Sequence, residues 1–335
     1  MKVLFYHLTP FSFAHGGLQI QIEQTREALL RLGVEVEFFR WYEDTQPGDI
    51  LHFFGRIRTP LLAPIRRNGF KLVLSDLLGG PAERTIGTLS LQRAAIRTAK
   101  KILPASYCSM FNWNGYELAD ACVALTPGEA HLMSYLFGAP AEKVHVVPNG
   151  VEDVFLQNVP SARGKWLVCT ATITPRKRVL EVAEAAIAAG TPLWIIGRPY
   201  GESDSYAQRF LSLARGNPNV IRYEGAIADR AQLARIYGEA RGFVLLSRWE
   251  SQSLSALEAA ACECPLLLSD FPWARNTFKE GASYCPIVPP AQIVPVLRRF
   301  YDAAPQLELP AKPPSWMDVA QQLKGVYESV LKNSR

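Results

Sequence analysis

The sequence lacks any long hydrophobic run. None of its apolar stretches approaches the roughly 18 residues that a membrane-spanning helix needs. The opening residues, MKVLFYHLTP, have neither the basic start nor the long apolar core of a signal peptide, and they predict a first strand. We therefore expect a cytoplasmic protein without a membrane span.

Cysteine is sparse and lacks the spacing of a metal site. Only Cys262 and Cys264 lie close together, and a single residue separates them. The pattern predicts reduced core thiols in a cytoplasmic protein rather than disulfides or zinc ligands. The six cysteines stand at 108, 122, 169, 262, 264 and 285.

Two further absences narrow the function. No Asp-x-Asp triplet follows a strand, so we expect no divalent metal on a diphosphate and no other cofactor. No nucleic-acid module is recognisable.

The 335 residues do suffice for two domains of about 150 residues each. A content of 48% hydrophobic and 20% charged residues is typical of a globular protein with a full core.

The stretch from Gly242 to Asp270 predicts one βαβ unit. Phe243 to Leu246 and Pro265 to Leu268 are short apolar runs typical of buried strands, and apolar residues recur at helical spacing between them. Parallel strands leave the connecting loop and the helix start at the carboxyl edge of the sheet, where α/β proteins bind ligands. We therefore expect the chemistry in this loop.

Two carboxylates bracket that loop, with seven residues between Glu250 and Glu258. The serines among these residues can cap the helix, and a capped helix start favours a phosphate. Glu258 then lies between one and two turns further on, where it can accept hydrogen bonds from a ribose. The alternative is an ordinary βαβ unit in which Glu250 is solvated.

The same stretch resembles the donor-site signature of the retaining glycosyltransferases of family 4, which have the GT-B fold. The resemblance rests on Glu250-x7-Glu258 and on the run LEAAACECP at 257–265. It implies an α/β chain of two doubly wound, Rossmann-like domains that face each other across a cleft. Nearly the whole chain fits this pattern.

The resemblance also implies roles for residues of the signature. In the family, the second Glu holds the ribose, the first lies near the donor sugar, and the amides between them meet the diphosphate. These roles fall to Glu258, to Glu250, and to the amides of Ser253 and Leu254. The family usually has glycine where this chain has Ser251 and Ser253, but a serine still offers its amide.

A cationic turn, TITPRKR at 172–178, follows the first predicted strand of the second half. Three cations at a helix start oppose the helix dipole, so helix stability does not explain them, whereas a diphosphate does. By the resemblance, Lys177 neutralises the leaving diphosphate, and the family's arginine falls on Thr172. Either Arg176 or Arg178 replaces that charge, or the arginine is dispensable here. A solvated basic turn is the alternative.

The family further implies a retaining reaction that needs no metal, in which Lys177, neighbouring arginines and helix N-termini stabilise the departing charge. Two loops at strand ends are implied to flank the nucleotide base. One contains Gly197 and Arg198, and the other contains Gly225.

In the first half, Gly16 and Gly17 stand between a predicted strand and a predicted helix. Two glycines allow a ligand to approach the backbone closely, although such a turn alone is more often a tight bend. In the family, a Gly-Gly loop here faces the donor phosphates and the acceptor. His15 beside it is an acceptor-binding candidate or, alternatively, a solvent-exposed loop residue.

Polar side chains lie in or directly after the third and fourth predicted strands, at 50–54 and 71–74. Many members of the family have a histidine that contacts the donor sugar where this chain has Ser75. Either Ser75 or Asp76 takes over part of that work, or His52 reaches in from the neighbouring strand end. All three are acceptor-side candidates.

A basic segment runs from residue 56 to 101. It has ten Arg and Lys against two acids, Asp76 and Glu83, which makes it +8, whereas the whole chain is +5. Apolar residues alternate with these cations, so the segment could contact anionic lipid head groups at the inner face of a membrane, or a phosphorylated acceptor. A solvated basic helix face is the alternative.

The predicted domains follow from these elements. Residues 1–157 form an acceptor-binding, Rossmann-like domain, which closes with the turn Asn149-Gly150-Val151. Residues 158–315 form the donor-binding, Rossmann-like domain. Residues 316–335 contain a last helix, which in the family packs back on the first domain.

The predicted function is transfer of a sugar from a UDP-, GDP- or ADP-linked donor to a hydroxyl of a glycan, glycolipid or small glycoside. The main alternative is a non-catalytic, glycosyltransferase-like subunit that binds nucleotide sugar, because Thr172 and Ser75 replace residues that relatives use. A nucleotide-sugar epimerase should lack the signature around Glu258, and a secreted ligand-binding protein should have a signal peptide. The sequence does not indicate the base, sugar, acceptor, linkage or oligomeric state.

Overall fold

The computed structural model describes residues 1–12, 16–159, 161–201 and 203–332. The chain divides into two compact units, one of Met1–Asn149 with Trp316–Arg335 and one of Gly150–Ser315. The division falls before the short helix α8 (Asp153–Leu156) rather than at the predicted residue 157. The reason is that α8 packs against α11 (Arg230–Glu239) and α12 (Leu254–Ala261) of the second unit.

The first unit contains a sheet of six parallel strands in the order β2-β1-β3-β4-β5-β6. The chain adds β2 on one side of β1 and the later strands on the other, so the order reverses between β1 and β3. Ligands of open α/β sheets bind at the carboxyl ends of strands beside such a reversal. The strands are β1 (Lys2–His7), β2 (Glu35–Phe38), β3 (Ile50–Phe54), β4 (Lys71–Ser75), β5 (Ala121–Ala124) and β6 (Val144–Val146).

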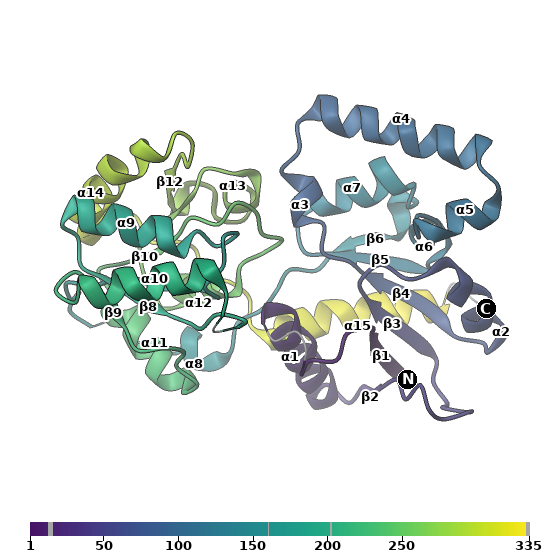
Figure 1. The fold of residues 1–335 in the computed structure, drawn as a ribbon. Coiled ribbons are helices and arrows are strands. Elements are labelled where there is room, and N and C mark those ends of the chain that lie inside the picture. The colour runs from purple at the N-terminus through teal and green to yellow at the C-terminus, as the bar shows by residue number, and fades with distance from the viewer. Residues whose placement is uncertain (13–15, 160, 202, 333–335) are drawn as a thin grey trace. The chain divides into compact units, whose positions relative to one another are not determined.

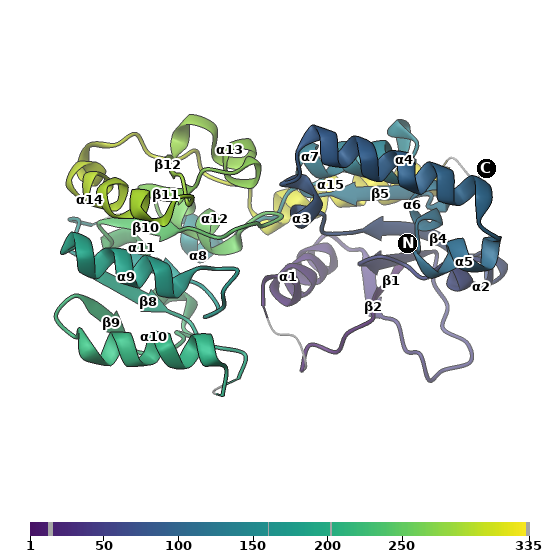
Figure 2. The same cartoon turned by 45° about the horizontal axis from the view of Figure 1, so that its top comes forward.

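Helices cover both faces of this sheet (Figures 1 and 2). Successive side chains of a strand point to opposite faces. On β3, His52 contacts Tyr327 of α15 (Trp316–Lys332), whereas Phe53 belongs to the core that α7 (Pro127–Phe137) completes. The C-terminal helix α15 therefore lies on one face, beside α1 (Gly17–Arg31), and α7 lies on the other.

Local signals define α7 well. The Thr126 hydroxyl accepts a hydrogen bond from the Glu129 amide at 3.2 Å, Pro127 opens the first turn, and Gly138 ends the helix with a φ of 79°. The sequence predicts a helix over 127–137, from the proline at its start to the glycine after its end, and the structure confirms this range. The other helices of the unit are α2 (Leu62–Arg67), α3 (Gly79–Ala82), α4 (Ile86–Ile102), α5 (Ala105–Met110) and α6 (Asn114–Leu118).

The second unit has its own sheet of six parallel strands, in the order β12-β11-β10-β7-β8-β9. The first strand of the unit lies in the middle, between β8 and β10, which is the order of dinucleotide-binding Rossmann sheets. The order therefore reverses between β7 and β10. The strands are β7 (Leu167–Thr170), β8 (Leu193–Ile196), β9 (Ile221–Tyr223), β10 (Gly242–Leu245), β11 (Leu266–Ser269) and β12 (Ser283–Cys285).

Two helix layers enclose this second sheet. Gly242 of β10 faces the Phe300 ring of α14 (Ile293–Ala303). The next residue, Phe243, packs against Tyr237 of α11, and their ring centres are 5.8 Å apart. The first layer joins α14 to α9 (Val179–Ala189) and α10 (Ser205–Gly216), and the second joins α8, α11 and α12. The unit also contains α13 (Pro272–Phe278).

The predicted fold class, an α/β chain with two Rossmann-like domains, is confirmed by the two parallel sheets and their alternating helices. Short 3-10 turns complete the described elements: η1 (Thr59–Leu61), η2 (Ala141–Lys143), η3 (Lys279–Gly281), η4 (Pro290–Gln292) and η5 (Ala304–Gln306). In the described part of the chain, no helix has both the length and the hydropathy to cross a membrane.

Candidate functional site

The loops after β7 and β10 meet at the point where the second sheet reverses its order. Two cations from the first loop converge on one carboxylate of the second. Lys177 Nζ lies 2.6 Å and Arg176 Nη1 lies 2.7 Å from the same Glu250 oxygen. Arg176 and Lys177, which the sequence analysis placed at the leaving diphosphate, are therefore adjacent in space to Glu250, although more than 70 residues separate the two loops along the chain.

Burial and neighbouring charges shift the pKa values of Glu250 and Lys177 in opposite directions. Glu250 is 8% exposed, and burial alone would raise its pKa, but Lys177 and Arg176 together hold that pKa below its usual value. Burial also lowers the pKa of Lys177, which the Glu250 charge partly offsets. Glu250 is therefore an anion fixed between two cations in a largely desolvated place.

Arg176 also contacts Trp249 and Arg248 of the β10 loop. Its guanidinium donates to the Trp249 carbonyl at 3.0 Å and stacks 4.8 Å from the Trp249 ring centre. Its own carbonyl accepts a hydrogen bond from the Arg248 amide at 2.9 Å. These bonds join the β7 and β10 loops, so the position of Lys177 relative to Glu250 is set by backbone as well as by charge.

The start of α12 lies next in the β10 loop. The Ser253 hydroxyl caps this helix by accepting from the Ala256 amide at 3.4 Å. The Ser253 and Leu254 amides precede the first intrahelical bonds, so neither has an intrahelical acceptor. This geometry is suited to an anion.

Glu258 lies one turn further along α12 and is 5% exposed. One of its oxygens is 2.5 Å from Arg230 Nη2, and the same guanidinium lies 2.7 Å from Glu152. Burial raises the pKa of Glu258, and Arg230 partly offsets that rise. Sequence reasoning missed Arg230 and Glu152, because no local pattern connects them with the signature.

The basic turn contains one further buried cation. Arg178 is 5% exposed, adopts a left-handed φ of 55° and precedes α9. Its Nε and Nη2 atoms have no hydrogen-bond partner among the described residues. Thr172, on which the family's arginine falls, is partly buried. Of the two candidate replacements, Arg176 is therefore engaged with Glu250, whereas Arg178 retains unused donors.

Two glycines shape the neighbouring strand ends. Gly197, after β8, has a φ of 153°, and a Cβ there would overlap the Ala171 carbonyl oxygen of the β7 loop. Its amide donates to the Gly225 carbonyl at 2.9 Å, and Gly225 has a φ of 85°. Arg198 is exposed beside them. These loops line up along one carboxyl edge because glycine permits the close approach.

In the first unit, Gly16 precedes α1 with a φ of 150°, and its carbonyl accepts from the Ile20 amide at 3.3 Å. Gly17 is exposed in the first turn. His15, an acceptor-side candidate, lies outside the described residues.

His52 occupies a different place from the one expected. It is 1% exposed, with Nδ1 lying 2.6 Å from the Tyr327 hydroxyl and Nε2 lying 2.7 Å from the Ser75 hydroxyl. Burial lowers the pKa of His52 to about 3, so the ring is neutral. Both ring nitrogens are used beneath α15, so neither is free in this structure, and an acceptor-side role for His52 stays a prediction. The Ser75 hydroxyl is engaged in the same contact.

Asp76 lies at the end of β4 in a second polar cluster. It accepts a hydrogen bond from the Tyr116 hydroxyl, and Arg56 Nε lies 3.6 Å from it and donates to the same hydroxyl at 3.1 Å. Burial raises the pKa of Asp76, whereas Tyr116 and Arg56 lower it in part. Of the acceptor-side candidates that the structure describes, Asp76 keeps a partly exposed carboxylate at the sheet edge.

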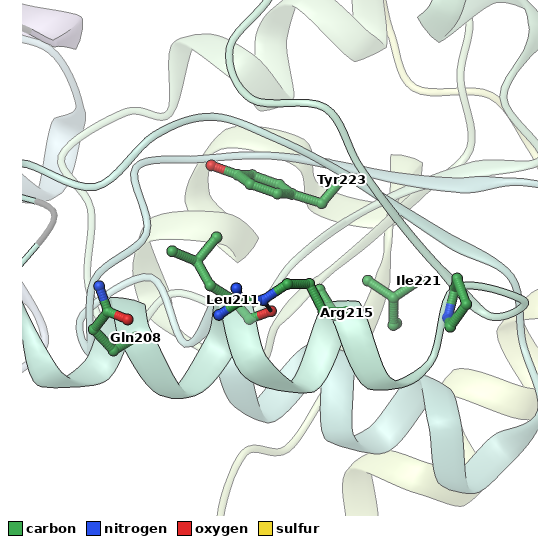
Figure 3. Close-up of a pocket in the computed structure, with 7 residues that line it drawn as sticks. Gln208, Leu211, Arg215, Ile221 and Tyr223 are labelled. Atoms are coloured by element: carbon green, nitrogen blue, oxygen red, sulfur yellow. Dashed lines mark hydrogen bonds between the residues drawn. The ribbon is translucent and has the colours of Figure 1, made fainter.

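Each unit also has an open pocket. One of about 340 Å³ lies at the carboxyl ends of β1, β2 and β3 and is lined mainly by the rings of Phe5, Tyr6, Phe11, Phe38, Phe39 and Trp41. One of about 480 Å³ lies between α10 and β9, where Gln208, Leu211 and Arg215 face Tyr223 (Figure 3). None of the predicted site residues lines either pocket, and the second contains no convergent charges.

The fold of the chain is that of a known structural class. The chain has the GT-B architecture of two Rossmann-like domains. Along 99% of both chains it superposes on a sucrose-phosphate synthase from Thermosynechococcus elongatus, with a TM-score of 0.70 and 16% identity. It is also similar in fold to Anabaena HepE in complex with UDP and glucose, with a TM-score of 0.67, 14% identity and coverage of 98% of this chain and 100% of the other.

The second unit is also similar in sequence to known proteins. Residues 157–300, fewer than half of the chain, match the family described as Glycosyl transferases group 1. A D-inositol 3-phosphate glycosyltransferase from Acidothermus cellulolyticus is 25% identical over 247 residues, which cover 65% of this chain and 55% of the relative. The chain thus spans about half the length of the curated relatives that it matches.

Proposed function

We propose that the protein is a retaining glycosyltransferase of family 4, which transfers a sugar from a nucleoside-diphosphate sugar to a hydroxyl acceptor without a metal. The observation that carries this proposal is the cluster of Arg176, Lys177 and Glu250 at the reversal point of a group 1 domain. A catalytic site for diphosphate departure needs fixed cations in a desolvated place, and this cluster supplies them.

The donor binds along the carboxyl edge of the second sheet. The diphosphate meets the Ser253 and Leu254 amides, and Glu258 holds the ribose. Because Glu258 is bonded to Arg230 at 2.5 Å, a ribose must share or displace that contact, and Glu152 at 2.7 Å remains as an alternative partner for Arg230. The loops of Gly197 and Gly225 flank the base.

The charge of the departing diphosphate is neutralised by Lys177 and by an arginine. Arg178 is the better candidate for the family's missing arginine, since its buried donors are unused, whereas Arg176 is occupied by Glu250 and Trp249. The acceptor hydroxyl attacks the face from which the diphosphate leaves, so the anomeric configuration is retained. Glu250 lies near the donor sugar and fixes the position of Lys177.

The acceptor belongs to the first unit. Asp76 offers a carboxylate at the end of β4, and the Gly16 and Gly17 loop offers backbone amides beside the reversal of the first sheet.

The relatives guide the choice of substrates. HepE was solved with UDP and glucose, which supports UDP-glucose as the first donor to test. The name of the inositol 3-phosphate relatives supports a phosphorylated polyol among the acceptors. We place the reaction in the cytoplasm.

The experiment is a turnover assay. UDP-, GDP- and ADP-linked sugars are incubated with a panel of glycoside and polyol phosphate acceptors, with and without EDTA, and release of the nucleoside diphosphate is measured. We expect one donor to turn over regardless of EDTA. Lys177→Ala should slow transfer by about 100-fold or more, while the exposed control Arg209→Ala should leave it unchanged.

The rival proposal is a non-catalytic subunit that binds nucleotide sugar. Binding of a donor without turnover on any acceptor would support this rival. Turnover that EDTA abolishes would contradict the metal-independent mechanism, and inversion of the anomeric centre in the product would contradict retention.

A further inference from the structure

The helices α4 and α5 of the first unit expose several large apolar side chains. Ile86 is 83%, Leu91 72%, Ile102 73% and Met110 73% exposed, and Leu103, Tyr107 and Phe111 are exposed as well. The helix α4 lies at the periphery of the unit, with α7 between it and the sheet (Figures 1 and 2). A soluble domain seldom exposes so many large apolar groups in one contiguous stretch.

The sequence of α4 divides the helix into an inner and an outer face. Ile96 is buried in the core, and Leu89 packs against that core. On the opposite side, Leu91, Ala95, Thr98 and Ile102 follow helical spacing and are exposed. These four residues, the outer face of α4, include no charged side chain.

Positive charge borders this outer face. From Arg84 to Phe111 the chain has five cations and no acid, a net charge of +5. Three of these cations have local partners. Lys100 lies 2.8 Å from Glu117, the Arg93 guanidinium lies 4.2 Å from the Tyr135 ring centre, and Arg84 donates to Gln92. Within the described residues, Arg97 and Lys101 form no ion pair, and both are exposed beside the outer face.

We propose that α4 and α5 dock on an anionic lipid bilayer. The outer face of α4 and the exposed side chains of α5 enter the boundary between head groups and acyl chains, and Arg97 and Lys101 meet the lipid phosphates. An apolar helix face bordered by cations is the pattern of interfacial helices. Charge favours this occupant over a second copy of the chain, because self-association would bring two faces of +5 together.

Only part of the basic segment 56–101 is exposed and available to a membrane. Leu62 and Ile96 are 6% and 4% exposed and belong to the core of the first unit. Arg56 and Arg66 are bonded within the unit, to Tyr116 and to the Leu118 carbonyl. The docking surface is therefore α4 with α5, at 86–111, rather than the whole segment 56–101.

The test is co-sedimentation of the full chain with vesicles and does not depend on any enzymatic activity. Vesicles of phosphatidylglycerol with phosphatidylcholine are compared with vesicles of phosphatidylcholine alone. We expect binding to the anionic vesicles that weakens as salt rises. The double variants Leu91→Asp/Ile102→Asp and Arg97→Glu/Lys101→Glu should each reduce the apparent affinity by tenfold or more.

Matched controls lie in the second unit. Val159→Asp/Val288→Asp changes two residues that are 85% and 75% exposed, and Arg209→Glu/Arg299→Glu reverses two exposed cations. Both control variants should bind like the unaltered chain. The proposal is overturned if anionic vesicles do not bind the chain, if neutral vesicles bind it equally well, or if the controls lose as much binding. A dimer that Leu91→Asp/Ile102→Asp dissociates would also overturn it and would assign the face to self-association.

Discussion

Glu258 is bonded to Arg230 in the structure, whereas its proposed role requires it to bind a ribose. The carboxylate is buried against Arg230, which in turn reaches Glu152. A ribose hydroxyl that takes over one oxygen of Glu258 replaces part of a charged contact, and Glu152 keeps Arg230 paired. The network therefore allows Glu258 to bind a ligand without leaving Arg230 an isolated buried cation.

Removal of this carboxylate should weaken nucleotide binding. Hydrogen bonds to a charged group contribute roughly 1.5 to 3 kcal/mol, so Glu258→Ala should raise the Kd of the nucleoside diphosphate by about tenfold or more. Calorimetric titration measures this change. Glu184→Ala, which removes an exposed carboxylate from α9, is the matched control. An unchanged Kd for Glu258→Ala would remove the ribose role.

His52 makes the stability of the first unit depend on pH. Burial lowers the pKa of the folded ring to about 3, compared with 6.5 for an unperturbed histidine. Between these values the unfolded chain binds a proton that the folded chain does not. The contribution of His52 is therefore complete above pH 6.5 and falls as the pH decreases, by up to about 1.4 kcal/mol per pH unit.

The variant His52→Gln should consequently show a flatter dependence of unfolding free energy on pH. The difference in slope should correspond to about one proton between roughly pH 4 and 6. Chemical denaturation at a series of pH values measures it, and the exposed His131→Gln serves as control. Equal slopes for the unaltered chain and His52→Gln would mean that the buried ring titrates near its ordinary pKa.

At the scale of elements, the loop after β8 depends on one glycine. A Cβ on Gly197 would overlap the Ala171 carbonyl oxygen, and the φ of 153° strains any other residue. Gly197→Ala should therefore lower the free energy of unfolding by a few kcal/mol and displace the β7 loop that leads to Lys177.

Thermal unfolding and nucleotide titration of Gly197→Ala test this expectation together. The control is Gly216→Ala, because a Cβ at Gly216 meets no atom within 4 Å. A variant at Gly197 with unaltered stability would show that the close contact with Ala171 is not required.

Strong periodicity decided which elements the sequence could predict. The strand β3 and the helices α7 and α9 have clear apolar patterns. The sequence predicts them over 50–54, 127–137 and 179–189, and the structure confirms these ranges. No element was predicted between residues 270 and 316, where α14 and β12 lie. Prolines interrupt the pattern there, and Pro295 is tolerated only because it stands in the first turn of α14.

At the scale of the whole molecule, alternation of strands and helices predicted two Rossmann-like domains but not the order of strands in either sheet. That order depends on which strands pair in three dimensions, and it places the reversal of the second sheet between β7 and β10. The resemblance assigned Lys177 and Glu250 to one donor site but did not predict their ion pair. The contribution of Arg230 follows only from the tertiary structure, since α11 packs against α12.

Hydrogen exchange of the full chain, measured by mass spectrometry with and without a nucleoside diphosphate, tests whether the donor binds at the carboxyl edge of the second sheet. The diphosphate is the one that stabilises the protein most in a thermal-shift panel of UDP, GDP and ADP. We expect slower exchange in 171–178, 196–198 and 250–258, the loops at the carboxyl edge of the second sheet. Protection confined to other parts of the chain, or no protection at a saturating concentration, would contradict it.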